Sequence, residues 1–167
     1  MLTSPPTALE FRQALGQFAT GVTVVTAERA PGKVHGMTAS SFASVSLDPP
    51  LVLVCIDHRA QMLEILEKQK RFGISILKEN QRSISRFFAQ QVQSVSEEER
   101  LGIRFRWTPS GIPLLENTLV QLGCKIFAAH VSGDHTVFIA EVECAEIHSG
   151  TPLLHCRGEY HRLVPLS

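Results

Sequence analysis

The last third of the chain consists of three long segments with the composition of β-strands. Residues 119–131, 136–147 and 152–163 are separated by two turn-like stretches, Ser132-Gly133-Asp134 and His148-Ser149-Gly150-Thr151. Earlier in the chain, shorter strand-like segments have helical segments inserted between them without a regular alternation. A doubly wound α/β protein would show that alternation. The pattern therefore predicts a mainly β protein, an antiparallel barrel with peripheral helices.

Three helices and three shorter strands are predicted before residue 90. Thr7 and Glu10 have the spacing of a capping box, in which a hydroxyl and a carboxylate three residues later satisfy free backbone N–H groups. Apolar residues then recur at helical spacing here and in two later segments. The expected helices span residues 8–18, 60–69 and 81–89, and the expected strands span 22–26, 51–56 and 72–77. The polar stretch 90–111 is expected to be a loop or flap, in which Ser96–Glu99 can cap one short helical turn.

The length and charge of the chain restrict its class. We expect one domain over residues 1–167, with a core of about 8–163. The 16 basic and 16 acidic side chains cancel, so no overall field attracts nucleic acid or an anionic membrane. Mean hydropathy lies just above zero, which either an oligomer with a buried apolar face or a generously filled monomer core would explain.

Signals for membranes, secretion and metal binding are missing from the sequence. The longest apolar run, Leu51–Ile56, has six residues, whereas a membrane-spanning helix needs about 20. The first residues lack the basic start and apolar stretch of a secretory signal. The four cysteines are far apart and include no Cys-x-x-Cys pair, so no metal site is predicted. Their apolar surroundings suit reduced, buried thiols in the cytoplasm.

The common short catalytic motifs are also missing. The sequence contains neither G-x-G-x-x-G nor G-x-x-x-x-G-K-[ST], so it has no Rossmann dinucleotide-binding turn and no P-loop. It contains neither G-x-S-x-G nor H-E-x-x-H. If the chain is an enzyme, its chemistry is therefore expected to come from a bound cofactor.

Two groups of residues in the first half could form a binding site. In Gly36-Met-Thr-Ala-Ser-Ser-Phe42, hydroxyls beside small residues would let the backbone approach a flat polar ligand, although a hydroxyl-capped strand end explains the same residues. The strand 51–56 runs into Asp57-His58-Arg59, where Arg59 and the first amides of the next helix suit a phosphate. The alternative is an ordinary N-cap beside a solvent-facing arginine.

Two further groups lie in the second half. Gly133-Asp134 would form a tight turn that projects His135 from the barrel end, where it could bind a substrate amide or move a proton. The alternative is a turn histidine that faces water. Arg157-Gly-Glu-Tyr160 holds the single tyrosine, and Trp107 is the single tryptophan. Either ring could stack on a ligand, but a place in a strand or in the core is commoner.

Taken together, these groups resemble motifs of the flavin reductase-like, FMN-binding split-barrel family. That family includes the small reductase components of two-component aromatic monooxygenases. The likeness runs from about Phe11 to Leu163. The matching segments are Phe18–Val25, Gly36–Phe42, Ser46–Leu53, Gly133–His135 and Pro152–Tyr160. Each motif is weak singly, whereas five in register are fairly specific for the family.

The resemblance implies a six-stranded antiparallel Greek-key split β-barrel that works as a homodimer, with flavin near the subunit interface. It also implies which residues contact the ligands. The isoalloxazine and ribityl chain would be bound by Thr38, Ala39, Ser40 and Ser41, and by Cys55, Ile56 and Asp57 at the strand end. The phosphate would lie near Arg59 and Ala60, with Arg86 and Phe88 on the third helix as further candidates, and His135 would lie on the nicotinamide side.

Three positions depart from the family pattern. Ala60 stands where relatives often carry a hydroxyl for the phosphate, so Arg59 and backbone amides would bear more of that role. Ala140 replaces a common glycine, which is a small change. His155-Cys156 replaces a more aromatic pair, and this would change the cofactor preference if the pair contacts nucleotide.

The activity implied by the resemblance is NAD(P)H-dependent reduction of FMN or FAD, which supplies reduced flavin to a partner monooxygenase. Hydride transfer would depend on positioning more than on acid–base catalysis, with His135 orienting the nicotinamide carboxamide. No basic cluster awaits a 2′-phosphate, which favours NADH over NADPH. Three alternatives stay open: a non-enzymatic flavin- or haem-binding split barrel, an oxidase of the pyridoxamine-phosphate type, and a ligand-free module.

Overall fold

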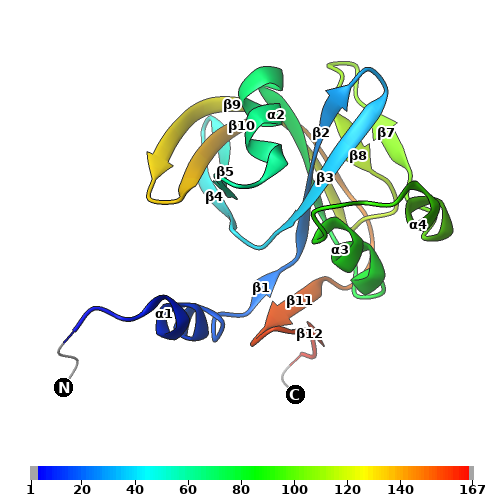
Figure 1. Ribbon diagram of the computed structural model, residues 1–167. Helices are drawn as coiled ribbons and strands as arrows, with labels where there is room; N and C mark the ends of the chain where they lie inside the picture. Colours follow the sequence, from blue (N-terminus) through cyan, green and yellow to red (C-terminus); the bar gives the residue numbers. More distant parts are fainter. Residues whose placement is uncertain (1–3, 166–167) are drawn as a thin grey trace.

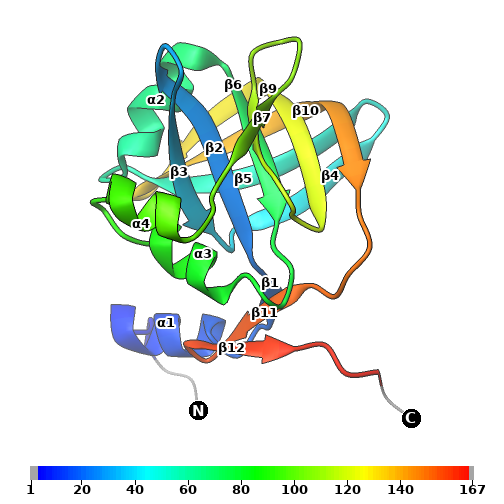
Figure 2. The same cartoon turned by 90° about the vertical axis from the view of Figure 1, so that its right-hand side faces the viewer.

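The computed structural model describes residues 4–165, and its main feature is a strongly curved antiparallel sheet (Figure 1 and Figure 2). The order across this sheet is β3-β2-β6-β9-β10-β5-β4. Its strands are β2 (Thr23–Ala30), β3 (Lys33–Ala39), β4 (Phe42–Leu47), β5 (Pro50–Asp57), β6 (Arg71–Ile76), β9 (Val120–Ser132) and β10 (His135–Ile147). The expectation of a mainly β protein with few helices is confirmed.

The expected count of six strands is wrong for this sheet, which has seven. β3 and β4 are its two edges, although only Ser40 and Ser41 separate them along the chain. β3 pairs with β2, whereas β4 pairs with β5. The chain therefore changes its hydrogen-bonding partner at this corner, and the change divides one run into two strands. The corner also draws the two edges of the curved sheet together.

Two smaller sheets complete the described part of the fold. They are β7 (Phe105–Trp107) with β8 (Pro113–Leu115), and β1 (Thr20–Gly21) with β11 (Leu153–Cys156) and β12 (Glu159–Arg162). The single strand expected over 152–163 is thus a hairpin. Arg157 and Gly158 adopt positive φ angles of 53° and 81°, which is the backbone of a tight two-residue hairpin turn. Alternation of residue types could not reveal this turn.

The helices begin and end at positions close to those expected, and α2 and α3 pack against the main sheet. They are α1 (Ala8–Leu15), α2 (Gln61–Gln69), α3 (Arg82–Phe88) and α4 (Val95–Arg100). The capping box of α1 is confirmed, because Thr7 Oγ1 accepts from the Glu10 N–H and the Glu10 carboxylate accepts from the Thr7 N–H. α1 ends at Leu15, three residues before the expected end at residue 18. Within residues 4–165, none of the helices has both the length and the apolar character that crossing a membrane requires.

Two clusters of buried side chains attach the helices to the sheet. The larger one includes Phe72 from the sheet, with Met62 and Leu66 from one face of α2. The second joins Val24 of β2 to Phe87 of α3. Burying a side chain of this size contributes about 1.5–3 kcal/mol. α2 and α3 are therefore held firmly on either side of β3.

Candidate functional site

A cavity of about 520 Å³ lies between β3, the junction of β5 with α2, and the segment that follows α3. We name it the cleft cavity. Its volume falls within the range of roughly 300–1,000 Å³ that is usual for small-molecule sites. It is lined by His35, Gly36, Met37, Thr38, Asp57, Arg59, Ala60, Gln61, Phe88, Ala89, Gln90 and Gln91. The elements that border it, β3, α2 and α3, lie next to one another across the centre of Figure 1.

One wall of the cleft cavity is formed where α3 packs on β3. Phe88 is buried and lies directly on Gly36, where an added Cβ would stand 2.5 Å from the Cδ1 of the ring. Thr38 donates a hydrogen bond from Oγ1 to the carbonyl oxygen of Ser85 at 2.7 Å. These contacts fix the position of β3 relative to α3, so this wall is rigid.

The junction of β5 with α2 supplies the charged groups. The Asp57 carboxylate accepts hydrogen bonds from the Nε, Nη2 and backbone N–H of Arg59 at 3.1, 2.6 and 2.8 Å. These bonds hold the pKa of Asp57 well below its usual range. The Arg59 side chain is 84% exposed, and its bonds to Asp57 do not use the Nη1 group. Ala60 is the N-cap of α2 and has no side-chain hydrogen bond to offer.

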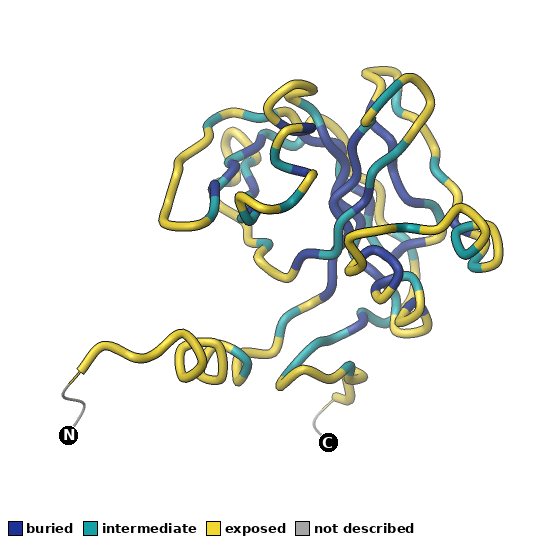
Figure 3. Tube along the Cα trace, viewed as in Figure 1, coloured by how far each residue is buried: buried dark blue, intermediate teal, exposed yellow. Residues whose placement is uncertain are grey.

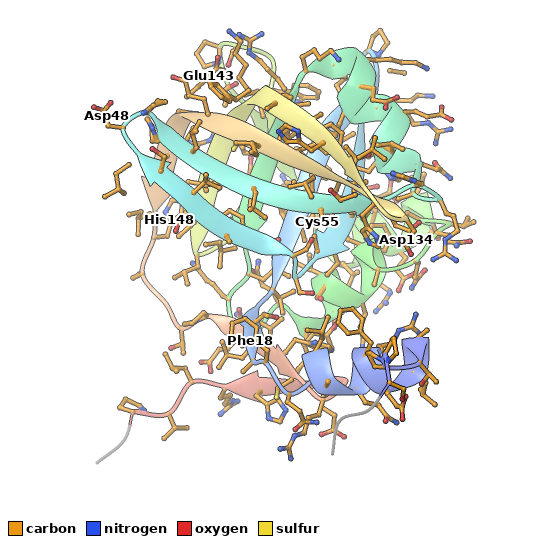
Figure 4. All side chains as sticks on the ribbon, turned by 90° about the vertical axis from the view of Figure 1, so that its left-hand side faces the viewer. Phe18, Asp48, Cys55, Asp134, Glu143 and His148 are labelled. Carbon is orange, nitrogen blue, oxygen red and sulfur yellow. The ribbon has the colours of Figure 1, made fainter. Side chains whose placement is uncertain are left out.

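Several predicted flavin contacts lie beside the cleft cavity without lining it. Ala39 and Ile56 are buried in the core, so their side chains face away from it. Ser40 and Ser41 form the corner between β3 and β4. The Ser41 hydroxyl donates to the Cys55 carbonyl at 3.0 Å and accepts from the Cys55 N–H at 3.2 Å. Figure 4 shows Cys55 on the wall that β4 and β5 form.

His135 also lies next to the cleft cavity rather than on it. It opens β10 directly after the turn at Gly133, whose φ is 65°, and Figure 4 shows Asp134 at this end of the strand pair. In the ladder between β10 and β5, His135 is the Cα partner of Asp57. Its Nδ1 lies 2.6 Å from the Asp134 carboxylate, and this contact lowers the pKa of Asp134. The turn thus brings His135 to the charged corner.

Arg86 does not line the cleft cavity but packs on the C-terminal hairpin. Its guanidinium carbon lies 5.9 Å from the centre of the Tyr160 ring, and that of Arg82 lies 5.3 Å away. The Tyr160 hydroxyl is 2.9 Å from the buried Ser85 Oγ. The single tyrosine therefore attaches β12 to α3, and the arginines of α3 stack on its ring.

Sequence reasoning did not identify the segment after α3 as part of the site. Gln90 and Gln91 line the cavity, and Gln93 donates a hydrogen bond to the Gly36 carbonyl at 2.7 Å. The one available signal was the polar character of residues 90–111, a stretch that also contains α4 and β7. His35 was missed as well, although burial and then the nearby Arg29 lower its pKa.

Comparison with known proteins supports the resemblance to flavin reductases along almost the whole chain. The family model for the flavin reductase like domain matches residues 15–164. An NADH-dependent flavin reductase from a Rhodococcus species is 45% identical over 159 residues, covering 94% of this chain and 87% of the relative. The reductase component of 4-hydroxyphenylacetate 3-monooxygenase from Thermus thermophilus is 36% identical over 157 residues, covering 92% and 95%.

The solved structures agree with the sequence comparison. The styrene monooxygenase flavin reductase from Pseudomonas putida superposes with a TM-score of 0.84 at 38% identity. The superposition covers 93% of this chain and 99% of that one. The sequence and the fold therefore agree, and the chain belongs to the flavin reductase like domain family.

Proposed function

We propose that this chain uses NADH to reduce FMN or FAD. The observation that carries the proposal is the cleft cavity, because it gathers around one hollow residues from three separate segments to which the family resemblance assigned flavin contacts. Thr38 comes from β3, Asp57, Arg59 and Ala60 come from the junction of β5 with α2, and Phe88 comes from α3. The relatives described above are an NADH-dependent flavin reductase and the reductase component of a monooxygenase, which supports this activity.

The groups around the cleft cavity fit a flavin. Arg59 and the first amides of α2 suit a phosphate, since α2 begins without a side-chain cap. The charge of Asp57 offsets that of Arg59, so Nη1 is the part of the guanidinium that would meet the phosphate. When bound, flavin supplies the acceptor for hydride from the nicotinamide. The protein's part is to hold the rings face to face and to exclude water.

His135 is the residue we assign to the nicotinamide. Its Nδ1 contacts Asp134, which orients the ring and leaves Nε2 to hydrogen-bond a carboxamide. Its side chain is 40% exposed, so it is accessible to a ligand that enters beside the flavin. A role in orientation, rather than in proton transfer, follows because hydride transfer needs no proton from this position.

We also propose that the chain folds as the Greek-key split barrel of the family. We propose further that it assembles as a homodimer. All eight residues of α1 are exposed, among them Leu9, Phe11 and Leu15. Figure 3 shows α1 exposed along its whole length, away from the body of the chain. An isolated helix this short is unstable in water, so a second copy that covers its apolar side chains is the proposed partner.

A monooxygenase is the proposed consumer of the reduced flavin. The Thermus thermophilus relative is the reductase component of a monooxygenase, which supports this partner. The cytoplasm is the proposed location, because all four cysteines are free thiols, as is usual in a reducing compartment.

The test is to mix the purified protein with FMN or FAD and with NADH or NADPH, and to follow the absorbance of the reduced nicotinamide. We expect flavin-dependent oxidation that is faster with NADH than with NADPH. A protein that binds flavin and oxidises neither nucleotide would be the non-enzymatic flavin binder instead. A protein without affinity for either flavin would refute both functions.

A further inference from the structure

Another cavity, of about 250 Å³, lies on the side of the main sheet that β7 and β8 cover, at the right of Figure 1. We name it the β7 cavity. It shares no lining residue with the cleft cavity, and the proposed function leaves it unused. An apolar cavity of about 150 Å³ is large enough for benzene, so the β7 cavity has room for one substituted aromatic ring. It is lined by Arg106, Trp107, Thr108, Pro109, Leu114, Gln121, Cys144, Ala145 and Glu146.

The floor of the β7 cavity is the paired surface of β9 and β10. Gln121 is the Cα partner of Glu146 in this ladder. Two positions away, Gly123 is the partner of Cys144, so all four residues share one face of the sheet. A Cβ added at Gly123 would stand 2.6 Å from the Cys144 Sγ. The glycine therefore leaves room for the thiol on this floor, and Leu114, 3% exposed, adds an apolar surface.

A tight turn after β7 forms the rim of the cavity. Thr108 Oγ1 accepts a hydrogen bond from the Ile112 N–H at 3.0 Å, and the Thr108 N–H donates to the Ile112 carbonyl at 2.9 Å. These bonds hold the end of β7 in place, and Trp107 with it. Trp107 nevertheless remains 39% exposed. A fixed, partly exposed indole is a surface on which an aromatic ligand can stack.

Three polar side chains of the β7 cavity are bonded to one another. Arg106 donates from Nη2 to Gln121 Oε1 at 2.7 Å and to the Glu146 carboxylate. The hydrogen bond from Arg106 lowers the pKa of Glu146, so this carboxyl is ionised at neutral pH. Both charged side chains are about half exposed. A ligand in the cavity therefore meets a pair without net charge that still offers N–H donors and a carboxylate acceptor.

These groups select among aromatic ligands. A hydroxyl on the ring can donate to the Glu146 carboxylate and accept from an N–H of Arg106. A ligand carboxylate would instead be repelled by Glu146. A ring without a polar group would take water from the ion pair without replacing the lost hydrogen bonds.

We propose that the β7 cavity binds a neutral, single-ring phenol, with its ring on Trp107 and its hydroxyl at the pair of Arg106 and Glu146. The site stands apart from the cleft cavity, so the proposal does not depend on the proposed function.

Phenol itself is the probe, and Trp107 is the reporter. It is the single tryptophan of the chain, so its indole N–H gives one signal of its kind in a ¹H–¹⁵N spectrum of labelled protein. The full-length protein is titrated with phenol, with toluene, which lacks the hydroxyl, and with benzoate, which carries a charge. We expect phenol to shift the Trp107 signal saturably, with a Kd below about 1 mM. Toluene and benzoate should bind at least about fivefold more weakly.

Two variants locate the bound phenol. Glu146→Gln removes the charged acceptor and should raise the Kd for phenol about tenfold, while the Kd for toluene stays within about twofold. Glu159→Gln is the matched control, because Glu159 is an exposed residue of β12 that does not line the β7 cavity. It should leave both affinities unchanged. Cys144→Leu extends a side chain over the floor and should abolish saturable binding of phenol. The other signals of the same spectrum show whether each variant is folded.

Contrary outcomes overturn the proposal at different points. Without a saturable shift by phenol, or with a shift that persists in Cys144→Leu, the β7 cavity is not the site. If toluene binds as tightly as phenol, or if Glu146→Gln has no effect, the hydroxyl is not recognised. If benzoate binds more tightly than phenol, the ligand is an anion. None of these measurements uses flavin or nucleotide, so the proposed function is tested separately.

Discussion

Cys124 and Cys144 lie close together on paired strands but in different surroundings. Cys124 on β9 is fully buried, and burial raises the pKa of its thiol to about 12. Cys144 on β10 is exposed, although the apolar stretch around it predicted a buried thiol. The ladder shifts its register between Val142 and Cys144. A shift of this kind changes which face a side chain occupies, and composition alone does not reveal it.

Alkylation should separate these two thiols. The thiolate is the reactive form, and at pH 8 a thiol with a pKa near 12 is ionised in only about one molecule in ten thousand. We expect iodoacetamide to modify Cys144 of the folded protein within minutes to hours and to leave Cys124 intact. Mass spectrometry of the peptides measures both, with protein unfolded in urea as the control in which both react. Equal modification in the folded state would contradict the assigned burial.

The role proposed for His135 predicts a specific kinetic change. Because the imidazole orients the nicotinamide and lies outside the lining of the cleft cavity, His135→Ala should raise the KM for NADH several-fold, about 1 kcal/mol for one lost hydrogen bond. The Kd for flavin should not change. His130→Ala, which removes an exposed histidine from β9, is the control. Weakened flavin binding with an unchanged KM would show that His135 serves the flavin instead.

Among the elements, α3 connects the C-terminal hairpin to the candidate site. Ser85 meets the Tyr160 hydroxyl through its side chain and Thr38 through its carbonyl oxygen. Phe88, one turn further, fills the space above Gly36. β12 is therefore linked through α3 to a wall of the cleft cavity, although the hairpin itself is remote from it in sequence.

This connection predicts graded effects at Tyr160. Tyr160→Phe keeps the ring that Arg82 and Arg86 contact and removes only the hydrogen bond to Ser85. It should lower the free energy of unfolding by about 0.5–1.5 kcal/mol. Tyr160→Leu removes the ring as well and should cost more. Urea unfolding measures both, and a Tyr160→Phe protein as stable as the wild type would show that the hydroxyl bond contributes nothing.

For the whole molecule, the proposed homodimer depends on the exposed apolar side chains of α1. Phe11 and Leu15 are four residues apart and so share one face of the helix. If a second copy covers this face, Phe11→Glu combined with Leu15→Glu should convert the dimer to a monomer at micromolar concentration. Analytical ultracentrifugation measures the change, and Gln13→Glu adds charge to the same helix as a control. A monomeric wild type, or a dimer that survives the double substitution, would exclude α1 as the interface.

Much of the architecture was predictable from local patterns. The capping box at Thr7 begins α1, the apolar spacing of Met62 and Leu66 marks the buried face of α2, and the turn at Gly133 delivers His135 to the start of β10. Each of these depends on residues within a few positions of one another. The flavin contacts implied by the family resemblance likewise indicated three of the segments that border the cleft cavity.

Other features depend on contacts between residues far apart in the chain. The seventh strand exists because the chain exchanges β2 for β5 at Ser40–Ser41, and the place of Gln90 in the cavity depends on how α3 packs on β3. The sequence by itself determined the three main helices, the long strands and the family, because periodicity, capping and motif spacing are properties of neighbouring residues. Only the tertiary structure decided which side chains share the cleft cavity, because such a hollow exists only when separate segments pack together.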